Sequence, residues 1–466
     1  MDSCFVKVFD FDGQAVELLD LFQDEPYVFF LDSVSPNRTT GRFSFIGFDP
    51  FEIFQSKGPG CWRWLKKNFS RYSSQAPCVS VSPLSGGIVG YLGYDLGFYL
   101  ENISRRIKKD LSLPDCFLGC YDCVITVDHF QKKLIITSTG YPEKNSLQRR
   151  VRARQRLSKI LQRLAGYKKK SISVEDRTKF AVSGKLPDNF KSDFTKENYL
   201  KAIKKILEHI KRGDVYQVNL SQRFEYPVPS RISSLDIYKR FRRISAFNLG
   251  GYMDCGDLQI MSGSPERFIK LEKGLVLTRP MKGTRARGEN PSDDKKKRQD
   301  LLKSDKDRAE LLMITDLERN DLGRVCEYGS IKVKQMRTLE KYKTVFQTTS
   351  TVEGKLRKDK NAFDVLQACF PGGSVTGCPK IRAMRIIEDL EPHHRGIYTG
   401  ALGYMSFSGR HMDFNILIRT LIAMRNKIYF HTGGGIVADS SPDEEYEETL
   451  VKAKAMRLCL EKFPGD

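Results

Sequence analysis

The stretch Asp214-Val-Tyr-Gln-Val-Asn-Leu-Ser221 follows a helical pattern directly and alternates apolar with polar side chains. Such alternation predicts a strand with one face toward the core. If Tyr216 and its alternate residues face the core, then Gln217, Asn219 and Ser221 line the other face, which is open to water or to a polar site. A helix that passes directly into a strand, without regular βαβ alternation along the chain, favours an α+β fold over a doubly wound one.

The helical pattern begins at Thr195 as N-cap and ends at Gly213. A polar, lysine-rich stretch over residues 166–193 precedes it and has the composition of a linker. Short strand patterns separated by Gly, Asp and Pro fill most of residues 1–165. The sequence therefore predicts an N-terminal strand-rich region, a linker, and a second region over residues 194–466 that carries the chemistry.

The composition is that of a soluble globular protein, with 40% hydrophobic and 29% charged residues. The N-terminus lacks the order of a signal peptide, and no apolar run approaches the roughly twenty residues of a membrane span. We therefore expect a cytoplasmic protein without membrane contact. Its 11 cysteines, an odd number, favour free thiols in a reducing compartment over a disulfide framework.

The net charge of +21 is compatible with nucleic acid, an anionic membrane or a small acidic substrate as partner. The basic residues are not interleaved with an aromatic stacking platform, and no known nucleic-acid module is present. We expect no nucleic-acid partner, although a basic nucleic-acid-binding protein stays an alternative from a different class.

One lysine lies in a sequence suited to chemistry, Thr278-Arg-Pro-Met-Lys-Gly-Thr-Arg285. Lys282 stands between Arg279 and Arg285, and neighbouring cations or burial would lower its pKa from the usual value of about 10.4. A neutral amine is a usable nucleophile or base. The alternative is a solvated lysine in a basic loop.

Two carboxylate pairs lie on predicted helices. Asp307 and Glu310 are three residues apart, and Glu445, Glu448 and Lys452 form one stripe on another helix. Two facing pairs would offer hard oxygen ligands suited to Mg²⁺. The alternative is that acidic residues simply favour the first turns of helices.

Three further features suit an anion. Gly433-Gly-Gly435 follows a predicted strand and could present consecutive backbone N–H groups, and Pro371 to Lys380 leads into a helix start. Arg419 stands in an apolar strand pattern, which usually means a buried partner or an anionic ligand.

Together these segments resemble the chorismate-utilising enzymes, which include component I of anthranilate synthase and of aminodeoxychorismate synthase. The resemblance runs from about residue 27 to 460. The motifs that carry it are Gly213 to Ser221, Gly263-Ser-Pro-Glu266, Arg279 to Arg285, Asp316-Leu-Glu-Arg-Asn-Asp-Leu-Gly-Arg324, Pro371-Gly-Gly-Ser-Val-Thr-Gly-Cys-Pro-Lys380, Arg395-Gly-Ile-Tyr-Thr-Gly400 and Gly433 to Glu448.

The resemblance implies two facing, mostly antiparallel β-sheets flanked by helices. It also implies that Glu310 and Glu448 ligate Mg²⁺, with Asp307 and Glu445 acting through water. The metal would neutralise one carboxylate of chorismate. The residues implied to receive the substrate's carboxylates are Tyr398, Arg419, Lys452 and the amides of Gly433 and Gly434, with Thr376 beside them.

The resemblance assigns the chemistry to Lys282, because many aminodeoxychorismate synthases carry lysine at this position where anthranilate synthases commonly carry alanine. Lys282 would add to the chorismate ring and Glu266 would protonate the departing hydroxyl. Ammonia would then give 4-amino-4-deoxychorismate. This implies a transferase of p-aminobenzoate and folate biosynthesis, in the transaminase class, with ammonia supplied by a glutamine amidotransferase partner.

Anthranilate synthesis in the tryptophan pathway is the close alternative, and salicylate or isochorismate synthesis is a third. Two departures from the family pattern bear on function. Gln347 stands where many relatives have histidine, and Ser245-Ala-Phe-Asn-Leu249 replaces a segment of the family's tryptophan pocket. Ser33 remains as a candidate residue of that pocket.

Overall fold

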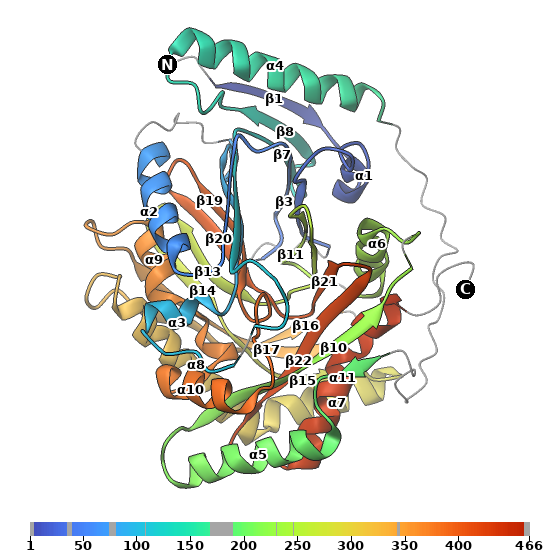
Figure 1. Cartoon of the computed structure of the whole chain (residues 1–466), viewed down its shortest axis with the longest axis vertical. Helices are drawn as coiled ribbons and strands as arrows, with labels where there is room; N and C mark the ends of the chain where they lie inside the picture. The colour runs from blue at the N-terminus through green and yellow to red at the C-terminus, as the bar shows by residue number, and fades with distance from the viewer. Residues whose placement is uncertain are drawn as a thin grey trace.

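A computed structural model describes the chain over residues 4–34, 40–73, 81–107, 109–167, 190–229, 231–245, 247–342 and 345–460. These residues form two antiparallel sheets that face each other, with helices on their outer sides (Figure 1). This is the α+β arrangement that the sequence predicts.

The larger sheet has twelve strands, in the order β1-β8-β7-β3-β2-β11-β12-β21-β22-β10-β18, with β9 paired to β10. Its strands are β1 (Phe5–Asp10), β2 (Phe29–Asp32), β3 (Phe43–Gly47), β7 (Cys123–Asp128), β8 (Lys133–Ser138), β9 (Lys191–Ser192), β10 (Gln217–Pro227), β11 (Gly250–Asp254), β12 (Gln259–Ser262), β18 (Gly377–Cys378), β21 (Thr420–Met424) and β22 (Lys427–Ile436).

The smaller sheet has ten strands, in the order β15-β17-β14-β13-β20-β19-β5-β6-β4, with β16 paired to β17. Its strands are β4 (Glu52–Ser56), β5 (Gly87–Leu92), β6 (Cys116–Tyr121), β13 (Arg267–Glu272), β14 (Leu275–Arg279), β15 (Met281–Ala286), β16 (Lys332–Lys341), β17 (Val345–Lys355), β19 (Ala401–Ser406) and β20 (His411–Ile416).

Helices cover the outer side of each sheet. They are α1 (Ala15–Leu19), α2 (Gly60–Ser73), α3 (Leu96–Leu100), α4 (Ser146–Ala165), α5 (Lys196–Lys211), α6 (Ser234–Ile244), α7 (Pro291–Lys303), α8 (Asp305–Gly323), α9 (Ala362–Cys369), α10 (Lys380–Leu390) and α11 (Pro442–Leu460), with the 3₁₀ turn η1 (Gly373–Val375). Helices α4, α5, α6, α10 and α11 pack on the larger sheet, and α2, α7, α8 and α9 pack on the smaller one.

The layer between the sheets is filled by large apolar side chains from both. Phe29 and Phe45 of the larger sheet meet Tyr91 and Phe117 of the smaller one in a single buried cluster. Burying such aromatic surface is the main favourable contribution to folding. The two sheets are therefore held as one body, and side chains at their shared end keep fixed positions.

Both sheets contain strands from each side of residues 166–193. Strand β2 pairs with β11, and β5 pairs with β19, so the predicted N-terminal and catalytic regions share their sheets. The division into regions 1–165 and 194–466 stays a prediction. Most of the predicted linker, residues 168–189, lies outside the described residues.

The helix predicted from Thr195 is confirmed as α5, and the Thr195 side chain accepts a hydrogen bond from the Asn198 N–H. The predicted core position of Tyr216 is wrong. Tyr216 precedes the first residue of β10 and is 67% exposed, while Gln217 is fully buried. The alternation of core and polar faces holds only from Val218 onward, within the paired part of the strand.

The predicted free thiols are confirmed for the described cysteines. None of the described helices combines the length and the apolarity needed to cross a membrane.

Candidate active site

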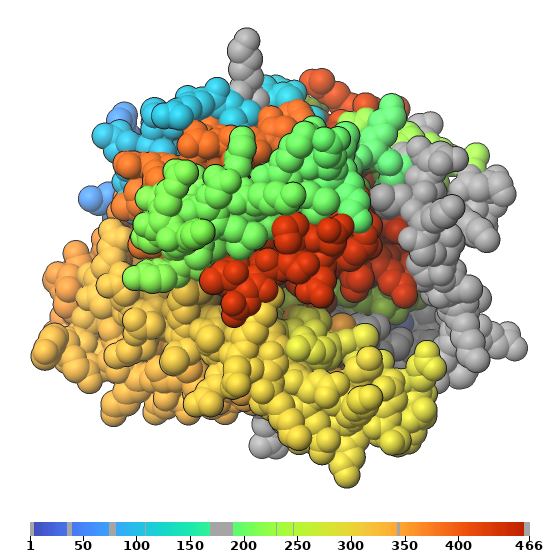
Figure 2. Space-filling model, turned by 90° about the horizontal axis from the view of Figure 1, so that it is seen from below, coloured from blue at the N-terminus to red at the C-terminus, as the bar shows by residue number. Residues whose placement is uncertain are grey.

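A cavity of about 430 Å³ lies where β10, β15 and β22 meet η1 and the helices α8 and α11. The space-filling view shows a furrow between α11, in red, and the yellow segment that contains α7 (Figure 2). Val451 of α11 lines the cavity and is 70% exposed, so it marks the rim. Most of the predicted site residues line this one cavity, although they come from segments far apart in the chain.

Lys282 lies on β15, which pairs with β17 and has an irregular register between Lys282 and Thr284. Gly283 at this irregularity has φ +72°, a conformation that favours glycine. The Lys282 Nζ lies inside the cavity and donates a hydrogen bond of 3.2 Å to the Ser374 carbonyl. The structure therefore contradicts the solvated-loop alternative for Lys282.

Burial lowers the pKa of Lys282, and Lys452 adds to this effect, while the carboxylates of Glu310 and Glu266 oppose it. Of the two predicted causes, burial is confirmed, whereas the neighbouring arginines are not the cations that act. Arg279 is paired with Glu340, and Arg285 donates to Asp307 at 2.8 Å, so both arginines have their own carboxylates. The lowered pKa thus comes from burial and from a lysine on α11 that is distant in sequence.

Glu266 stands at the wall of the same cavity, just before β13, and is 4% exposed. Burial raises the pKa of its carboxyl group, against the hydrogen bond from Ser374 and the charges of Lys282 and Arg419. The Ser374 hydroxyl donates to Glu266 Oε1 at 2.6 Å. A carboxyl group whose proton is favoured by burial is suited to act as a general acid.

The two predicted carboxylate pairs lie on two helices that border the cavity. Asp307 and Glu310 lie on α8, and Glu445 and Glu448 lie on α11. Glu445 accepts from Ser440 Oγ at 2.7 Å. The carboxylates therefore reach one space from opposite helices.

These carboxylates suit a divalent cation by their chemistry, since all donors are hard oxygens. Glu310 forms no hydrogen bond or ion pair within the described part of the chain, and burial raises its pKa. No group of three metal-ligating side chains is already gathered closely among the described residues. The donor set thus fits Mg²⁺, with Glu310 as the carboxylate free to coordinate it.

Arg419 projects into the cavity from the segment between β20 and β21, outside a strand, and so the prediction that it lies in a strand is wrong. Its φ of +48° is unusual for a residue with a side chain and costs about 1 kcal/mol. Within the described residues, its guanidinium has no hydrogen bond or ion pair, and burial lowers its pKa. A buried cation without a counter-charge is suited to bind an anion.

Two further predicted substrate-binding residues, Tyr398 and Lys452, also line the cavity. Tyr398 stacks on His431 with ring centroids 4.8 Å apart, and both line the cavity. Lys452 pairs with Glu448 at 2.6 Å and donates to the Gly433 carbonyl at 2.9 Å.

Thr376 does not reach the wall of the cavity. It is fully buried and its hydroxyl donates to the Gly372 carbonyl at 2.8 Å. Gly433 and Gly434 do line the cavity, but inside β22 and paired with β10, rather than after a strand. Successive N–H groups of a strand point to opposite sides, so the predicted nest of consecutive amides is not formed.

Gly434 lies directly beneath the carboxylates of α11. A Cβ at this position would lie 2.9 Å from Glu445 Oε2 and 4.0 Å from Glu448 Oε1. A side chain here would therefore require the end of the Glu445 side chain to shift.

Many lining residues were not among the predicted site residues, and three of them make polar contacts that shape the cavity. Ser374 contacts both Lys282 and Glu266, Lys306 contacts Glu445 at 3.3 Å, and the Gln347 amide donates to Thr284 at 3.3 Å. Ser374 lies inside the motif Pro371 to Lys380, and this was the available signal. The pairing of Lys306 with α11 could not be found from local pattern, because it joins two helices distant in sequence.

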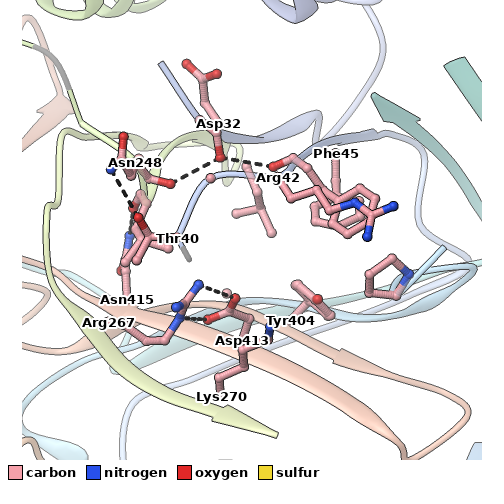
Figure 3. Close-up of a pocket in the computed structure, with 18 of the residues that line it drawn as sticks. Asp32, Thr40, Arg42, Phe45, Asn248, Arg267, Lys270, Tyr404, Asp413 and Asn415 are labelled. Atoms are coloured by element: carbon pink, nitrogen blue, oxygen red, sulfur yellow. Dashed lines mark hydrogen bonds and ion pairs between the residues drawn. The ribbon is translucent and has the colours of Figure 1, made fainter. Parts of the chain in front are cut away.

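Ser33 lines a separate cavity of about 220 Å³ between the two sheets (Figure 3). Its hydroxyl donates to the carbonyls of Phe43 and Asn248 at 3.0 and 3.1 Å. Arg267 and Asp413 form an ion pair of 2.9 Å in the wall. The role of Ser33 in binding tryptophan stays a prediction.

Comparison with known proteins assigns this architecture to a family. The family model described as chorismate binding enzyme matches residues 27–458. Anthranilate synthase component 1 of Thermus thermophilus is 34% identical over 97% of this chain and 96% of its own length. Aminodeoxychorismate synthase component 1 of Bacillus subtilis is 35% identical over 92% of this chain and 86% of its own length.

Among solved structures, anthranilate synthase component I from Streptococcus pneumoniae has a TM-score of 0.76 at 30% identity, covering 91% of this chain and 94% of that one. The isochorismate synthase MenF from Escherichia coli shares the fold, with a TM-score of 0.74 at 18% identity over 98% of this chain and 95% of its own. The chain therefore belongs to the chorismate binding enzymes.

Proposed function

We propose that this chain is component I of aminodeoxychorismate synthase, which converts chorismate and ammonia to 4-amino-4-deoxychorismate. The observation that carries the proposal is the partly buried amine of Lys282 in a cavity lined by five carboxyl groups and by Arg419, whose guanidinium has no partner among the described residues. Burial favours the neutral amine, which is the nucleophilic form. The resemblance supports it, since lysine at this position is common in aminodeoxychorismate synthases.

Chorismate carries two carboxylates, and the cavity offers cationic groups for them. Arg419, with no counter-charge among the described residues, would hold one carboxylate together with Tyr398. Lys452 and the Gly433–Gly434 backbone lie nearby and would add to carboxylate binding. Thr376 would act only from behind the cavity wall, through η1.

Mg²⁺ would be held by Glu310 and Glu448, with Asp307 and Glu445 orienting its water ligands. When bound, the metal would neutralise one carboxylate of chorismate. The chain's own contribution is to hold oxygen donors on two helices that face each other across the cavity.

In the proposed reaction the Lys282 amine forms a bond to C2 of the ring. The ring double bonds shift, the C4–O bond breaks, and Glu266 gives its proton to the departing hydroxyl, which leaves as water. Ammonia then bonds to C4, the double bonds shift back, and the C2–N bond to Lys282 breaks. The covalent step divides one difficult displacement into two easier ones.

Ammonia would come from a glutamine amidotransferase partner. The sequence shows no evident glutaminase nucleophile site, and the relatives are named as component 1. Free ammonium would replace the partner in an assay of the chain alone.

Anthranilate synthase component I is the second candidate, because relatives with that name match at the same level of identity. In that case the same ammonia would enter next to the ring carboxylate and pyruvate would be released. Gln347 stands at the Lys282 end of the cavity, where many relatives have histidine. Its amide cannot titrate near neutral pH, so it cannot serve as an acid or a base in either reaction.

The deciding experiment incubates the purified chain with chorismate, Mg²⁺ and ammonium and separates the products by chromatography. We expect a para-aminated product that keeps its enolpyruvyl group and becomes p-aminobenzoate only after a lyase is added. Fluorescent anthranilate with pyruvate would assign the chain to the second candidate. Turnover without ammonium would point to isochorismate or salicylate synthesis and would exclude both.

A further inference from the structure

One turn of the chain touches both groups that the proposed reaction uses. Ser374, in the middle of η1, accepts the hydrogen bond of Lys282 Nζ with its carbonyl, at 3.2 Å. Its hydroxyl donates to Glu266 Oε1 at 2.6 Å. Ser374 is 4% exposed and lines the cavity, so its contacts form at the buried wall of the site. A single residue therefore connects the nucleophile and the acid.

The turn is held by side chains rather than by a regular helix or sheet. Asn219 Nδ2 donates to the Ser374 carbonyl at 2.9 Å, and Arg395 donates to the Val375 carbonyl at 2.9 Å. On the other side, a Cβ at Gly373 would lie 2.5 Å from Leu317 of α8, so the turn is packed closely against that helix. These contacts fix the position of Ser374 relative to β10 and α8.

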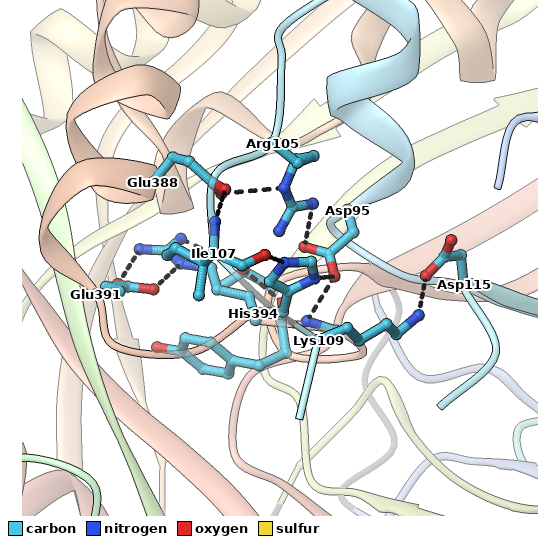
Figure 4. A network of polar contacts seen from close by, with 12 residues as sticks. Asp95, Arg105, Ile107, Lys109, Asp115, Glu388, Glu391 and His394 are labelled. Atoms are coloured by element: carbon cyan, nitrogen blue, oxygen red, sulfur yellow. Dashed lines mark hydrogen bonds and ion pairs between the residues drawn. The ribbon is translucent and has the colours of Figure 1, made fainter. Parts of the chain in front are cut away.

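Arg395 is itself anchored in a wider network. It forms a buried ion pair with Glu391 at 2.8 Å. The preceding residue, His394, contacts the Ile107 carbonyl and Asp95 (Figure 4), and the Gly396 N–H donates to Asp95 at 3.2 Å. The backbone on both sides of Arg395 is thus anchored to the segment that follows β5.

The hydroxyl of Ser374 has a chemical consequence for Glu266. The Ser374 hydroxyl is bonded to Oε1, and the Met281 N–H also donates to this carboxyl group. Ser374 thereby fixes the orientation of the carboxyl group and favours its ionised form. Loss of the hydroxyl would leave Oε1 without this hydrogen bond and the carboxyl group less firmly oriented.

We propose that Ser374 is a positioning residue, whose hydroxyl orients the Glu266 carboxyl group while its carbonyl holds the Lys282 amine. The inference rests on the proposed function, in which Glu266 is the acid and Lys282 the nucleophile. It goes further by assigning the mutual orientation of these two groups to one residue of η1.

The test compares Ser374→Ala, Glu266→Gln and the double variant, with Ser350→Ala as control. Ser350 is also fully buried and donates to a backbone carbonyl, at 3.2 Å, but lies outside the cavity lining. We expect Ser374→Ala to lower kcat for chorismate consumption roughly 10- to 100-fold, with KM changed less than about twofold because the hydroxyl serves the acid rather than binding. In the Glu266→Gln background the same change should add less than about a further twofold.

The pH profile gives a readout that a merely structural role would not move. Lys282, Arg419 and Glu318 are the charged or titratable groups that face Glu266, and all are retained in Ser374→Ala. The Ser374 hydrogen bond stabilises the carboxylate, so its loss should move the alkaline limb of kcat/KM to higher pH even though the rate is lower. An unchanged profile, or additive losses in the double variant, would overturn the proposal.

Two further measurements separate a loss of the Ser374 role from a loss of folding and from a failure of the proposed function. If Ser374→Ala unfolds at a lower temperature than the wild type, Ser374→Cys fills a similar volume with a weaker donor and should show the same loss. Consumption of chorismate is measured whichever aminated product forms, so failure of the product assignment does not mimic failure of the Ser374 role. A wild-type chain that consumes no chorismate would refute the proposed function instead.

Discussion

The cavity that contains Ser33 and the cavity that contains Lys282 both have charged side chains in their walls. They differ in whether these side chains are paired with groups of opposite charge in the protein. Around Ser33, each cationic side chain of the wall has a carboxylate. Arg267 pairs with Asp413 at 2.9 Å, and Lys270 pairs with Glu272 at 2.6 Å. The charges there are balanced by the protein itself.

Around Lys282 the balance is incomplete within the described residues. Among the residues that the structure describes, the guanidinium of Arg419 has no carboxylate partner, Glu310 has no cation at ion-pair distance, and Lys282 forms a hydrogen bond only to a carbonyl. Burying a charge without a counter-charge costs free energy, so such groups persist where a ligand completes them or where reactivity requires them. The comparison separates a cavity balanced by its own ion pairs from a cavity whose charges the described residues leave uncompensated, as the proposed binding of anions and a metal requires.

The largest effect should come from Lys282→Ala, with Lys270→Ala of the Ser33 cavity as its control. We expect amination of chorismate to fall at least about 10³-fold, because the nucleophile is absent. The thermal unfolding temperature should not fall, since a buried amine with a lowered pKa does not favour the folded state. Lys270→Ala should keep its rate. Mass spectrometry during turnover should detect a ring adduct on Lys282 of the wild type. Unchanged turnover in Lys282→Ala would end the nucleophile assignment.

The second test compares one arginine from each cavity. Arg419→Met should raise the KM for chorismate roughly 10- to 100-fold, as expected for losing a charge-assisted hydrogen bond of about 1.5–3 kcal/mol. Its free energy of unfolding should not decrease, because Arg419 forms no ion pair with any residue that the structure describes.

Arg267→Met should behave in the opposite way. It leaves Asp413 without its partner and should lower the free energy of unfolding by about 3 kcal/mol, with KM unchanged. Urea unfolding and steady-state kinetics of both variants measure these effects. If the two arginines affected stability equally and KM equally, the contrast between the cavities would be wrong.

The features that could be predicted from the sequence are those set by short segments of the chain. Local patterns identified α5, and the motifs identified most of the predicted site residues that line the cavity of Lys282. These features depend on periodicity and residue type, which are properties of short segments. The fold class followed because helices and strands alternate without βαβ regularity.

The errors lie where long-range contacts decide. Arg279 and Arg285 are next to Lys282 in sequence, but each is neutralised by a carboxylate from another element, and the cation that acts on Lys282 is Lys452. Likewise, Gly433 looked like part of a loop, although pairing with β10 extends β22 through it. Sequence adjacency does not reveal which charges are already compensated.

A smaller effect is expected from Glu448→Gln, with Glu272→Gln of the Ser33 cavity as control. Replacing one carboxylate oxygen ligand by an amide should raise the Mg²⁺ concentration for half-maximal activity about tenfold or more. At saturating Mg²⁺ the maximal rate should fall by a smaller factor than the factor by which the half-maximal Mg²⁺ concentration rises. Titration of metal against activity measures both quantities. An identical Mg²⁺ requirement in Glu448→Gln and the wild type would count against its role as a ligand.

The smallest effect concerns the titration of Lys282 itself. Lys452 lowers the pKa of Lys282, so Lys452→Met should raise that pKa and move the onset of the neutral amine to higher pH. The measurement is the rate of modification of Lys282 by an amine reagent as a function of pH, without substrate, so that effects on chorismate binding do not enter. Lys454→Met on the same helix is the matched control, because Lys454 does not line the cavity. If Lys452→Met left the labelling curve in place, burial alone would control the amine, and the unbalanced charges of this cavity would serve binding rather than nucleophilicity.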